Sequence, residues 1–251
     1  MFVHCGASPL RLKLKSLGAP ADDVDILLRA VKRRLTFSAQ ENVVGEGDTA
    51  PQVRILLAGT TCSYKRKEDG GRIILSFHHP GEFCDLHRYV LRDSEPALAV
   101  QALTDCTVAV IDYRDMDGLL SRPTLASALW RASMLETAVY RERLTRTGRG
   151  TAIVRVAYLL CEQLERRGAF GNQARQLPFS QIDVADATGL SVVHVNRTIQ
   201  TLRALNVLSP ATRAIEVLDR KQLEKIAGFD GRLLALPTLV SKWAVQVETN
   251  G

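Results

Sequence analysis

The sequence predicts an α+β protein in which an N-terminal β-roll of the jelly-roll kind is followed by a long helix and a C-terminal winged helix-turn-helix. Three observations predict this fold. Short β-type runs occupy residues 37–112, helical periodicity runs unbroken through 121–146, and two capped helices separated by a glycine occupy 180–205. The expected domains are the β-roll at 1–120, the long helix and hinge at 121–147, the winged helix-turn-helix at 148–228 and a C-terminal extension at 229–251.

The composition is that of a folded protein. Of the 251 residues, 46% are hydrophobic, so the chain can bury a substantial core. The basic residues among the first 18 positions alternate with leucines and no apolar stretch follows them, which does not fit a signal peptide. No run approaches the ~18–20 apolar residues that a membrane helix needs. We therefore expect a soluble, cytoplasmic protein.

The five cysteines are scattered and include no CxxC pair, which disfavours a zinc site or an iron–sulfur cluster. We expect reduced thiols in a cytoplasmic core. A redox-sensing role is the alternative, and Cys84 and Cys161 are the candidates for it.

The positive charge is concentrated in the second half of the chain. Of the net charge of +6, residues 1–120 contribute −1, residues 121–147 contribute +3 and residues 148–225 contribute +4. A polyanionic partner would require the excess in this half, although a solvated basic face has the same composition.

Residues 9–36 are expected to be helical, with one helix starting near Pro20. Six β-type runs follow, separated by turn signals of which Asp69-Gly70 is the strongest hairpin signal. The runs are 42–44, 53–57, 61–65, 72–77, 97–102 and 106–111. Their spacing is near the ~8–12 residues typical of a sandwich or barrel.

Residues 121–146 are predicted to form one long helix, capped by Ser121 and with Pro123 in its first turn. Apolar residues recur along it at spacings of three and four, which is typical of a short coiled-coil seam. We expect these residues to hold a homodimer together, the alternative being a helix packed on its own domain. They are Leu125, Ala128, Ala132, Leu135 and Val139.

Residues 177–208 read LPFSQIDVADATGLSVVHVNRTIQTLRALNVL. Ser180 is expected to cap a short helix at 181–188, Gly189 to supply the tight turn, and Ser191 to cap a second helix that ends near Leu205. Three apolar residues of the second helix fall on one inward face, namely Val195, Ile199 and Leu202. This order of elements is that of a helix-turn-helix.

The second helix of such a motif presents its N-terminal side chains to the major groove of DNA. An arginine there pairs with guanine and an asparagine with adenine, whereas serine, histidine and glutamine suit phosphates. Residues 206–208 and 214–218 are expected to pair as a wing with Arg213 at its tip. The candidate DNA-binding residues are therefore Ser180, Ser191, Val192, Val193, His194, Asn196, Arg197, Gln200 and Arg213.

Residues 10–228 resemble the Crp/Fnr family of transcription regulators, most closely in GLSVVHVNRTIQTLR (189–203) and in GGRIILSFHHPGEFCDLH (70–87). The resemblance implies a β-roll of the cyclic-nucleotide-binding type, a dimerisation helix and a winged helix that binds a two-fold symmetric operator. The expected partners are double-stranded DNA, a second copy of the chain and RNA polymerase. By position, Val192, Val193, Asn196 and Arg197 match the family's base-contacting residues. Val193 stands where many members carry glutamate, so a different sequence preference is expected.

The same resemblance argues against cyclic AMP as the effector. Members that bind it have a Gly-Glu pair for the ribose and an Arg-Ser pair for the phosphate. The matching positions here are Asp85-Leu86 and Pro96-Ala97. Arg88 and Arg92 are the nearest substitutes, but we expect both in a surface helix and loop. The sequence thus predicts no cofactor and leaves the effector open.

Two alternatives keep a ligand or metal in the β-roll. One is a haem sensor of the same family, with Cys84, His78 and His79 as candidate ligands. The other is a jelly-roll metal enzyme that uses His78, His79 and Glu82. Because neighbouring strand residues point to opposite faces, the two histidines would face one metal only if the strand ended there. We therefore expect no metal site and no catalytic residue.

Overall fold

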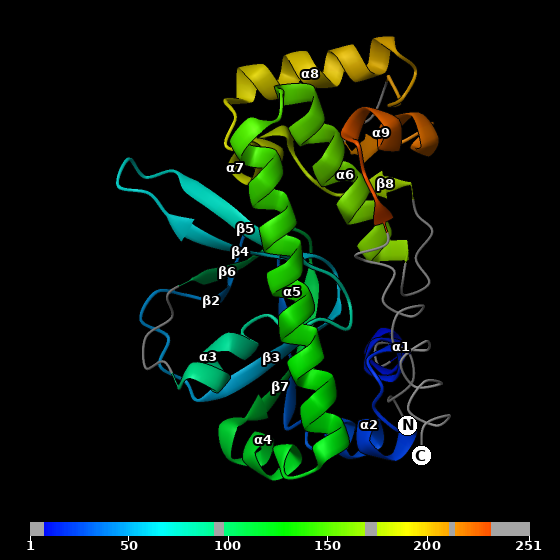
Figure 1. Ribbon diagram of the computed structural model, residues 1–251. Coiled ribbons are helices and arrows are strands. Elements are labelled where there is room, and N and C mark those ends of the chain that lie inside the picture. The colour runs from blue at the N-terminus through cyan, green and yellow to red at the C-terminus, as the bar shows by residue number, and fades with distance from the viewer. Residues whose placement is uncertain (1–7, 93–97, 169–174, 211–213, 232–251) are drawn as a thin grey trace, which may run out of the picture. The chain divides into compact units, whose positions relative to one another are not determined.

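The computed structural model describes residues 8–92, 98–168, 175–210 and 214–231 (Figure 1). These residues form two compact units. The first contains 8–63, 78–92 and 98–137, and the second contains 64–77, 138–168, 175–210 and 214–231. The second unit therefore includes a hairpin, residues 64–77, that we had expected to belong entirely with the β-roll.

The first unit begins with α1 (Ser8–Ser16) and α2 (Ala21–Arg29), which pack on a three-stranded antiparallel sheet. The sheet has the order β1-β7-β3, formed by β1 (Arg33–Phe37), β7 (Cys106–Asp112) and β3 (Gln52–Ala58). Because strand side chains alternate between faces, Val53, Ile55 and Leu57 join the core under the helices, whereas Leu56 joins a second core on the other face.

The second sheet has the order β2-β6-β4-β5. Its strands are β2 (Asn42–Val44), β6 (Ala99–Ala102), β4 (Thr61–Arg66) and β5 (Arg72–His78). Val44, Val100 and Val108 are among the residues that form the second core. Gly59 turns the chain between β3 and β4 at a φ of +87°, where a Cβ would lie 2.4 Å from the carbonyl oxygen of Asp105. Only glycine fits this turn without displacing backbone.

Two segments of the first unit differ from the sequence-based expectation. Residues 33–36 were expected to be helical, but they lie in β1, which pairs in register with β7 from Arg33↔Val110 to Phe37↔Cys106. Ser121 was expected to cap the long helix, but it ends α4 (Tyr113–Leu120), and its hydroxyl donates to the carbonyl of Gly118 at 2.7 Å. The long helix, α5, spans Pro123–Arg149, so it begins and ends slightly later than the expected 121–146 and includes the residues expected to form the hinge.

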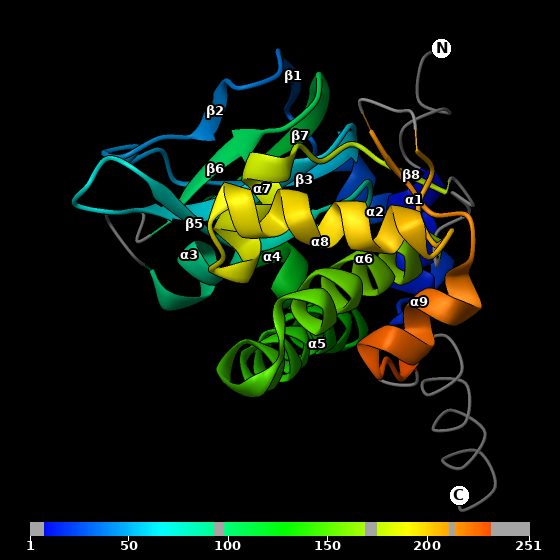
Figure 2. The same cartoon turned by 90° about the horizontal axis from the view of Figure 1, so that it is seen from above.

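The second unit is built around α6 (Ala152–Gly168), which packs against α9 (Arg220–Ala227), α7 (Gln181–Thr188) and α8 (Val192–Ala204). Figure 2 shows α8 and α7 together above α6. Nine consecutive residues of α6, 156–164, are buried, so this helix is covered around its whole circumference.

The pairing predicted for the wing is present, whereas its tip lies outside the described residues. Residues 206–208 were expected to pair with 214–218, and an antiparallel bridge between Leu208 and Val217 joins them, with the Leu218 N–H donating to the Val207 carbonyl at 2.9 Å. The strand β9 (Ile215–Glu216) also pairs with β8 (Gln176–Leu177), which the sequence did not indicate. A strand of two residues has too few positions to show an alternating pattern.

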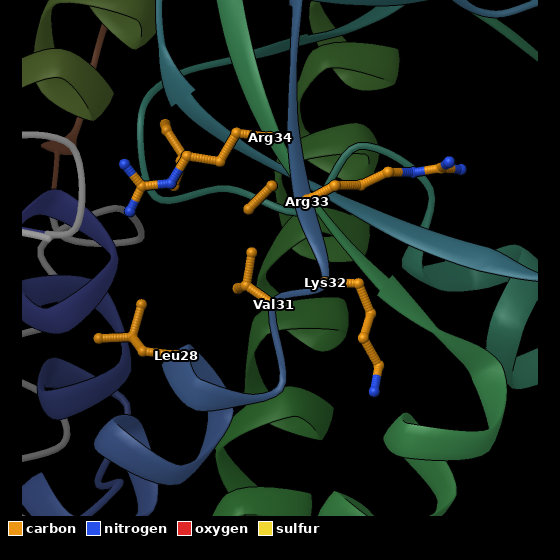
Figure 3. A pocket seen from close by; sticks show the side chains of 7 residues that line it. Leu28, Val31, Lys32, Arg33 and Arg34 are labelled. Carbon is orange, nitrogen blue, oxygen red and sulfur yellow. The ribbon is translucent and has the colours of Figure 1, made fainter. Parts of the chain in front are cut away.

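A cavity of about 270 Å³ lies on the helix-covered face of the three-stranded sheet (Figure 3). Its lining residues are Leu28, Val31, Lys32, Arg33, Arg34, Leu57 and Ala109. Arg33 and Arg34 extend to opposite sides of the chain, as neighbouring strand residues do. The cavity is therefore lined from the α2 side of the sheet and not from the inside of the roll.

Candidate DNA-binding site

The two helices of the motif begin and end where the sequence predicted. The Ser180 hydroxyl accepts from the backbone N–H of Asp183, whose carboxylate accepts in return from the Ser180 N–H at 2.8 Å, so the two residues form a capping box. Gly189 ends α7 at a φ of +67°. The Ser191 hydroxyl caps α8 by accepting from the backbone N–H of His194 at 3.3 Å.

One face of α8 is anchored and the other is exposed. Val195, Ile199 and Leu202 are buried, as predicted from their spacing. Val192 and Val193 are 44% and 68% exposed, and large apolar side chains on a surface often mark an interaction site. The other predicted contact residues of α8 are also exposed, namely His194, Asn196, Arg197 and Gln200.

The caps limit what some of the predicted residues can do. The Ser180 hydroxyl donates to the Asp183 carboxylate at 2.7 Å, and the Ser191 hydroxyl lies 3.3 Å from His194 Nδ1. Both hydroxyls are thus engaged within the motif, so these serines serve first as structural caps. Arg213 lies outside the described residues.

Sequence reasoning missed Gln181. Its side-chain oxygen accepts from Asn196 Nδ2 at 3.0 Å, and this bond orients the amide of Asn196 at the exposed face of α8. A glutamine directly after the cap of the first helix is a weak signal, because glutamine is common in helices of any role.

The candidate ligands of the haem and metal-enzyme alternatives have protein partners in the β-roll. His78 Nδ1 lies 3.0 Å from the Thr61 hydroxyl and His78 Nε2 lies 3.3 Å from the Ser63 hydroxyl. Glu82 accepts from Lys13 Nζ at 2.8 Å and from the His79 N–H at 2.9 Å. Among the residues that the structure describes, no group of three or more His, Cys, Asp and Glu side chains is placed to hold a metal ion.

The positions that the family uses for ribose and phosphate are only partly described, because Pro96 and Ala97 lie outside the described residues. Asp85 is 1% exposed and accepts from Arg54 through both its backbone N–H and its Nη1, each at 2.8 Å. Burial raises the pKa of Asp85, and the charge of Arg54 opposes that rise. Leu86 is 6% exposed and packs in the core of the first unit.

Arg88 was expected on a surface helix, and this expectation is wrong. Arg88 lies on α3 (Leu86–Leu91) but is 1% exposed, and its Nη2 donates to the backbone carbonyl of Asp48 at 2.7 Å. Arg92 is exposed, as expected, and pairs with Asp117.

The two candidate redox cysteines are buried free thiols. Burial raises the pKa of the Cys84 thiol far above its ordinary value, and nearby Asp85 raises it further. Burial likewise raises the pKa of Cys161 to about 12. Because the thiolate is the reactive form, these surroundings disfavour oxidation of either residue in the folded chain.

The predicted dimer seam does not match the exposed face of α5. Leu125 and Ala128 are 0% exposed and pack into the chain's own core, and Val139 is 5% exposed. Ala132 and Leu135 are half-buried. Spacings of three and four occur on every face of a helix, so periodicity alone could not distinguish the face packed on its own domain from a face turned to a partner.

Comparisons with known proteins identify both parts of the chain. A cyclic nucleotide-binding domain model matches residues 34–122, and a Crp-like helix-turn-helix domain model matches residues 154–226. Within the described residues, none of the helices has the length and apolar character needed to cross a membrane.

Two relatives that are named as regulators align with this chain over more than nine tenths of their own length. The nitrogen fixation regulation protein FixK of Rhizobium meliloti is 28% identical in sequence. The alignment covers 90% of this chain and 99% of the FixK chain. The transcriptional activator protein Anr of Pseudomonas aeruginosa is 26% identical, and the alignment covers 89% of this chain and 91% of the Anr chain. The solved structure of FixK2 from Bradyrhizobium japonicum is 26% identical, covers 79% of this chain and 98% of its own, and superposes with a TM-score of 0.69.

A β-roll of the cyclic-nucleotide-binding type in one chain with a capped helix-turn-helix defines a DNA-binding transcription regulator. Over both parts the chain is similar to the Crp/Fnr family of these regulators. The family resemblance, the fold class and the regulatory function predicted from the sequence are thereby confirmed.

Proposed function

We propose that this regulator binds a two-fold symmetric operator as a homodimer, with α8 of each copy in the major groove. The observation that carries the proposal is the exposed N-terminal half of α8 on a motif whose two helices are both capped. A rigid motif places side chains reproducibly against base edges, because their positions do not have to be fixed at the time of binding.

Four exposed residues of α8 are the proposed base contacts. Arg197 is suited to a bidentate pair with guanine, and Asn196, held by Gln181, to a pair with adenine. The methyl groups of Val192 and Val193 are suited to the methyl group of thymine. His194 and Gln200 are proposed to contact phosphates, which position the protein without reading sequence.

We propose that the second copy packs against a different face of α5 from the one predicted. Trp130, Met134 and Leu144 are 67%, 49% and 73% exposed. Together with Thr137 and Arg141 they follow spacings of 4, 3, 4 and 3, which is the period of a coiled-coil seam. An equivalent helix from a second copy would present the same apolar residues, as a two-fold interface requires.

The effector is proposed not to be cyclic AMP. A buried cyclic phosphate needs a cation or several N–H donors, and the ribose needs an acceptor. Arg54 is already paired with Asp85, and Leu86, at the position of the family's glutamate, has no acceptor in its side chain.

We also propose a cytoplasmic location, contact with RNA polymerase, and no enzymatic activity, since the named relatives are regulators.

Selection of bound sequences from random double-stranded DNA tests this function. The expected result is an enriched site with two inverted half-sites whose centres lie about 10–10.5 base pairs apart. Enrichment of a site without two-fold symmetry, or of no site at all, would contradict the proposal.

A further inference from the structure

The hairpin of residues 64–77 is attached to the first helix of the DNA-binding motif by Arg72. Arg72 Nη2 lies 2.5 Å from Asp183 Oδ1, and Arg72 Nε lies 2.8 Å from Asp186 Oδ2. The three side chains are only 17%, 7% and 20% exposed. Water screens such ion pairs much less than it screens pairs on an open surface.

Two further contacts lie along the same strand, β5. The ring of Phe77 packs against the ring of Phe179, just before α7, with centroids 4.4 Å apart. Arg143 of α5 donates to the carbonyl oxygen of Leu75 at 2.6 Å and also pairs with the buried Glu162 of α6 at 2.6 Å. Strand β5 thus contacts α7 through Arg72, the segment before α7 through Phe77, and α5 through the carbonyl of Leu75.

The ion pairs lie on the side of α7 that faces away from the recognition surface. Gln181 marks the recognition side, because it bonds Asn196 of α8. At about 100° of rotation per residue, Asp183 and Asp186 project roughly 200° and 140° away from Gln181. The hairpin can thus hold α7 while leaving the exposed residues of α8 free to meet DNA.

We propose that the two ion pairs of Arg72 are an intramolecular clamp that holds α7, and through it α8, in the DNA-binding arrangement. Asp183 gives the clamp a firm attachment, since it also forms the capping box with Ser180. Removing Arg72 would leave a buried carboxylate without its cation and would loosen α7. DNA would then have to order the motif on binding, which lowers affinity.

The hairpin that carries Arg72 is continuous in sequence with the β-roll. Strands β4 and β5 continue from the hairpin into the first unit, where Thr61 and Ser63 of β4 contact the ring of His78 at the end of β5. A shift of either strand in the roll would therefore displace Arg72, six residues away from His78. The clamp makes DNA affinity dependent on the state of these two strands.

Amide hydrogen exchange of the full chain without DNA tests the contact itself. In Arg72→Ala, the amides of α7 should exchange about 5- to 10-fold faster than in the wild type. In the matched control Lys65→Ala, an exposed residue of the same hairpin, their exchange should not change. Unchanged exchange of α7 in Arg72→Ala would overturn the proposal.

Affinity for the selected operator tests the consequence, and this arm rests on the proposed DNA binding through α8. Arg72→Ala should weaken binding about 3- to 10-fold, and Asp186→Ala combined with it should add little, because both variants remove the same contact. The exchange of charges in Arg72→Asp with Asp186→Arg should restore part of the affinity. Equal or tighter operator binding by Arg72→Ala would overturn the clamp. If the wild-type chain binds no operator, the proposed function is refuted, and the hydrogen-exchange result alone decides whether the clamp exists.

Discussion

Individual residues of the motif divide into those that build it and those that remain available to DNA. The hydroxyls of Ser180 and Ser191 are engaged as caps, whereas Arg197 is exposed and has its guanidinium free of any capping role. The sequence predicted all three as DNA-binding residues because serine suits both caps and phosphates. Only the geometry separates the two roles.

Replacing Arg197 tests the proposed base contact. Arg197→Ala should abolish preference for the selected operator, because each bidentate arginine–guanine pair contributes about 1–3 kcal/mol and a dimer has two of them. Arg197→Lys keeps the charge but loses the planar fork, so it should retain non-specific binding while losing most of the preference. Fluorescence anisotropy with operator and scrambled duplexes measures both, and an unchanged operator affinity in Arg197→Ala would refute the assignment of α8.

Burial of single polar residues was the least predictable property of the sequence. Arg88 lies in a stretch of polar residues and was expected at the surface, yet the fold brings the Asp48 carbonyl to its guanidinium. The burial of Asp85 likewise depends on its ion pair with Arg54 of β3. Such partners lie 31 to 40 positions apart in sequence, so no local pattern indicates them.

At the scale of elements, local signals predicted most of the secondary structure. The bounds expected for α7 and the start of α8 are those observed, because caps and a positive-φ glycine are encoded in a few adjacent residues. The strands β8 and β1 were not predicted, because their partners β9 and β7 are distant in sequence. The helix α5 was predicted, but not the face that is exposed.

The contact between α2 and the start of α5 gives a pH-dependent prediction. Asp23 accepts hydrogen bonds from the Thr124 hydroxyl and from Arg122, and these bonds lower its pKa. Because this pKa is lower in the folded chain than in the unfolded chain, the bonds stabilise the fold above about pH 4 and are lost as the pH falls below it. Asp23→Asn should therefore lower the thermal unfolding midpoint at pH 7, and the difference from wild type should shrink toward pH 3. The exposed neighbour Asp22 provides the control, and an Asp22→Asn variant that behaves like Asp23→Asn would contradict this account.

The exposed face of α5 predicts which substitutions break the proposed dimer. Trp130→Glu combined with Leu144→Glu should shift the protein from dimer to monomer at micromolar concentration, because four carboxylates would be buried in the two-fold seam. Leu91→Glu, at a residue 68% exposed on α3, should leave the dimer intact. Sedimentation velocity measures the change, and a dimer that persists in the double variant would place the interface elsewhere.

For the whole molecule, the proposal that cyclic AMP is not the effector gives a direct prediction. Calorimetric titration with cyclic AMP and with cyclic GMP, each with and without operator DNA, should show no binding in the micromolar range. The reason is that Leu86, at the position of the family's glutamate, offers the ribose no acceptor. Micromolar binding that also tightens the DNA complex would contradict this, and would direct attention to Arg88, whose Nε and Nη1 make no hydrogen bond within the described part of the chain.

The stoichiometry of the complex with operator DNA tests the central claim most directly. If two copies read two half-sites, native mass spectrometry should find two chains of 27.7 kDa on each duplex that carries the full operator. A duplex with one half-site inverted to a direct repeat should bind much more weakly, since a two-fold dimer cannot match it. One chain per full operator duplex, with equal affinity for the direct repeat, would contradict the account of a dimeric helix-turn-helix regulator.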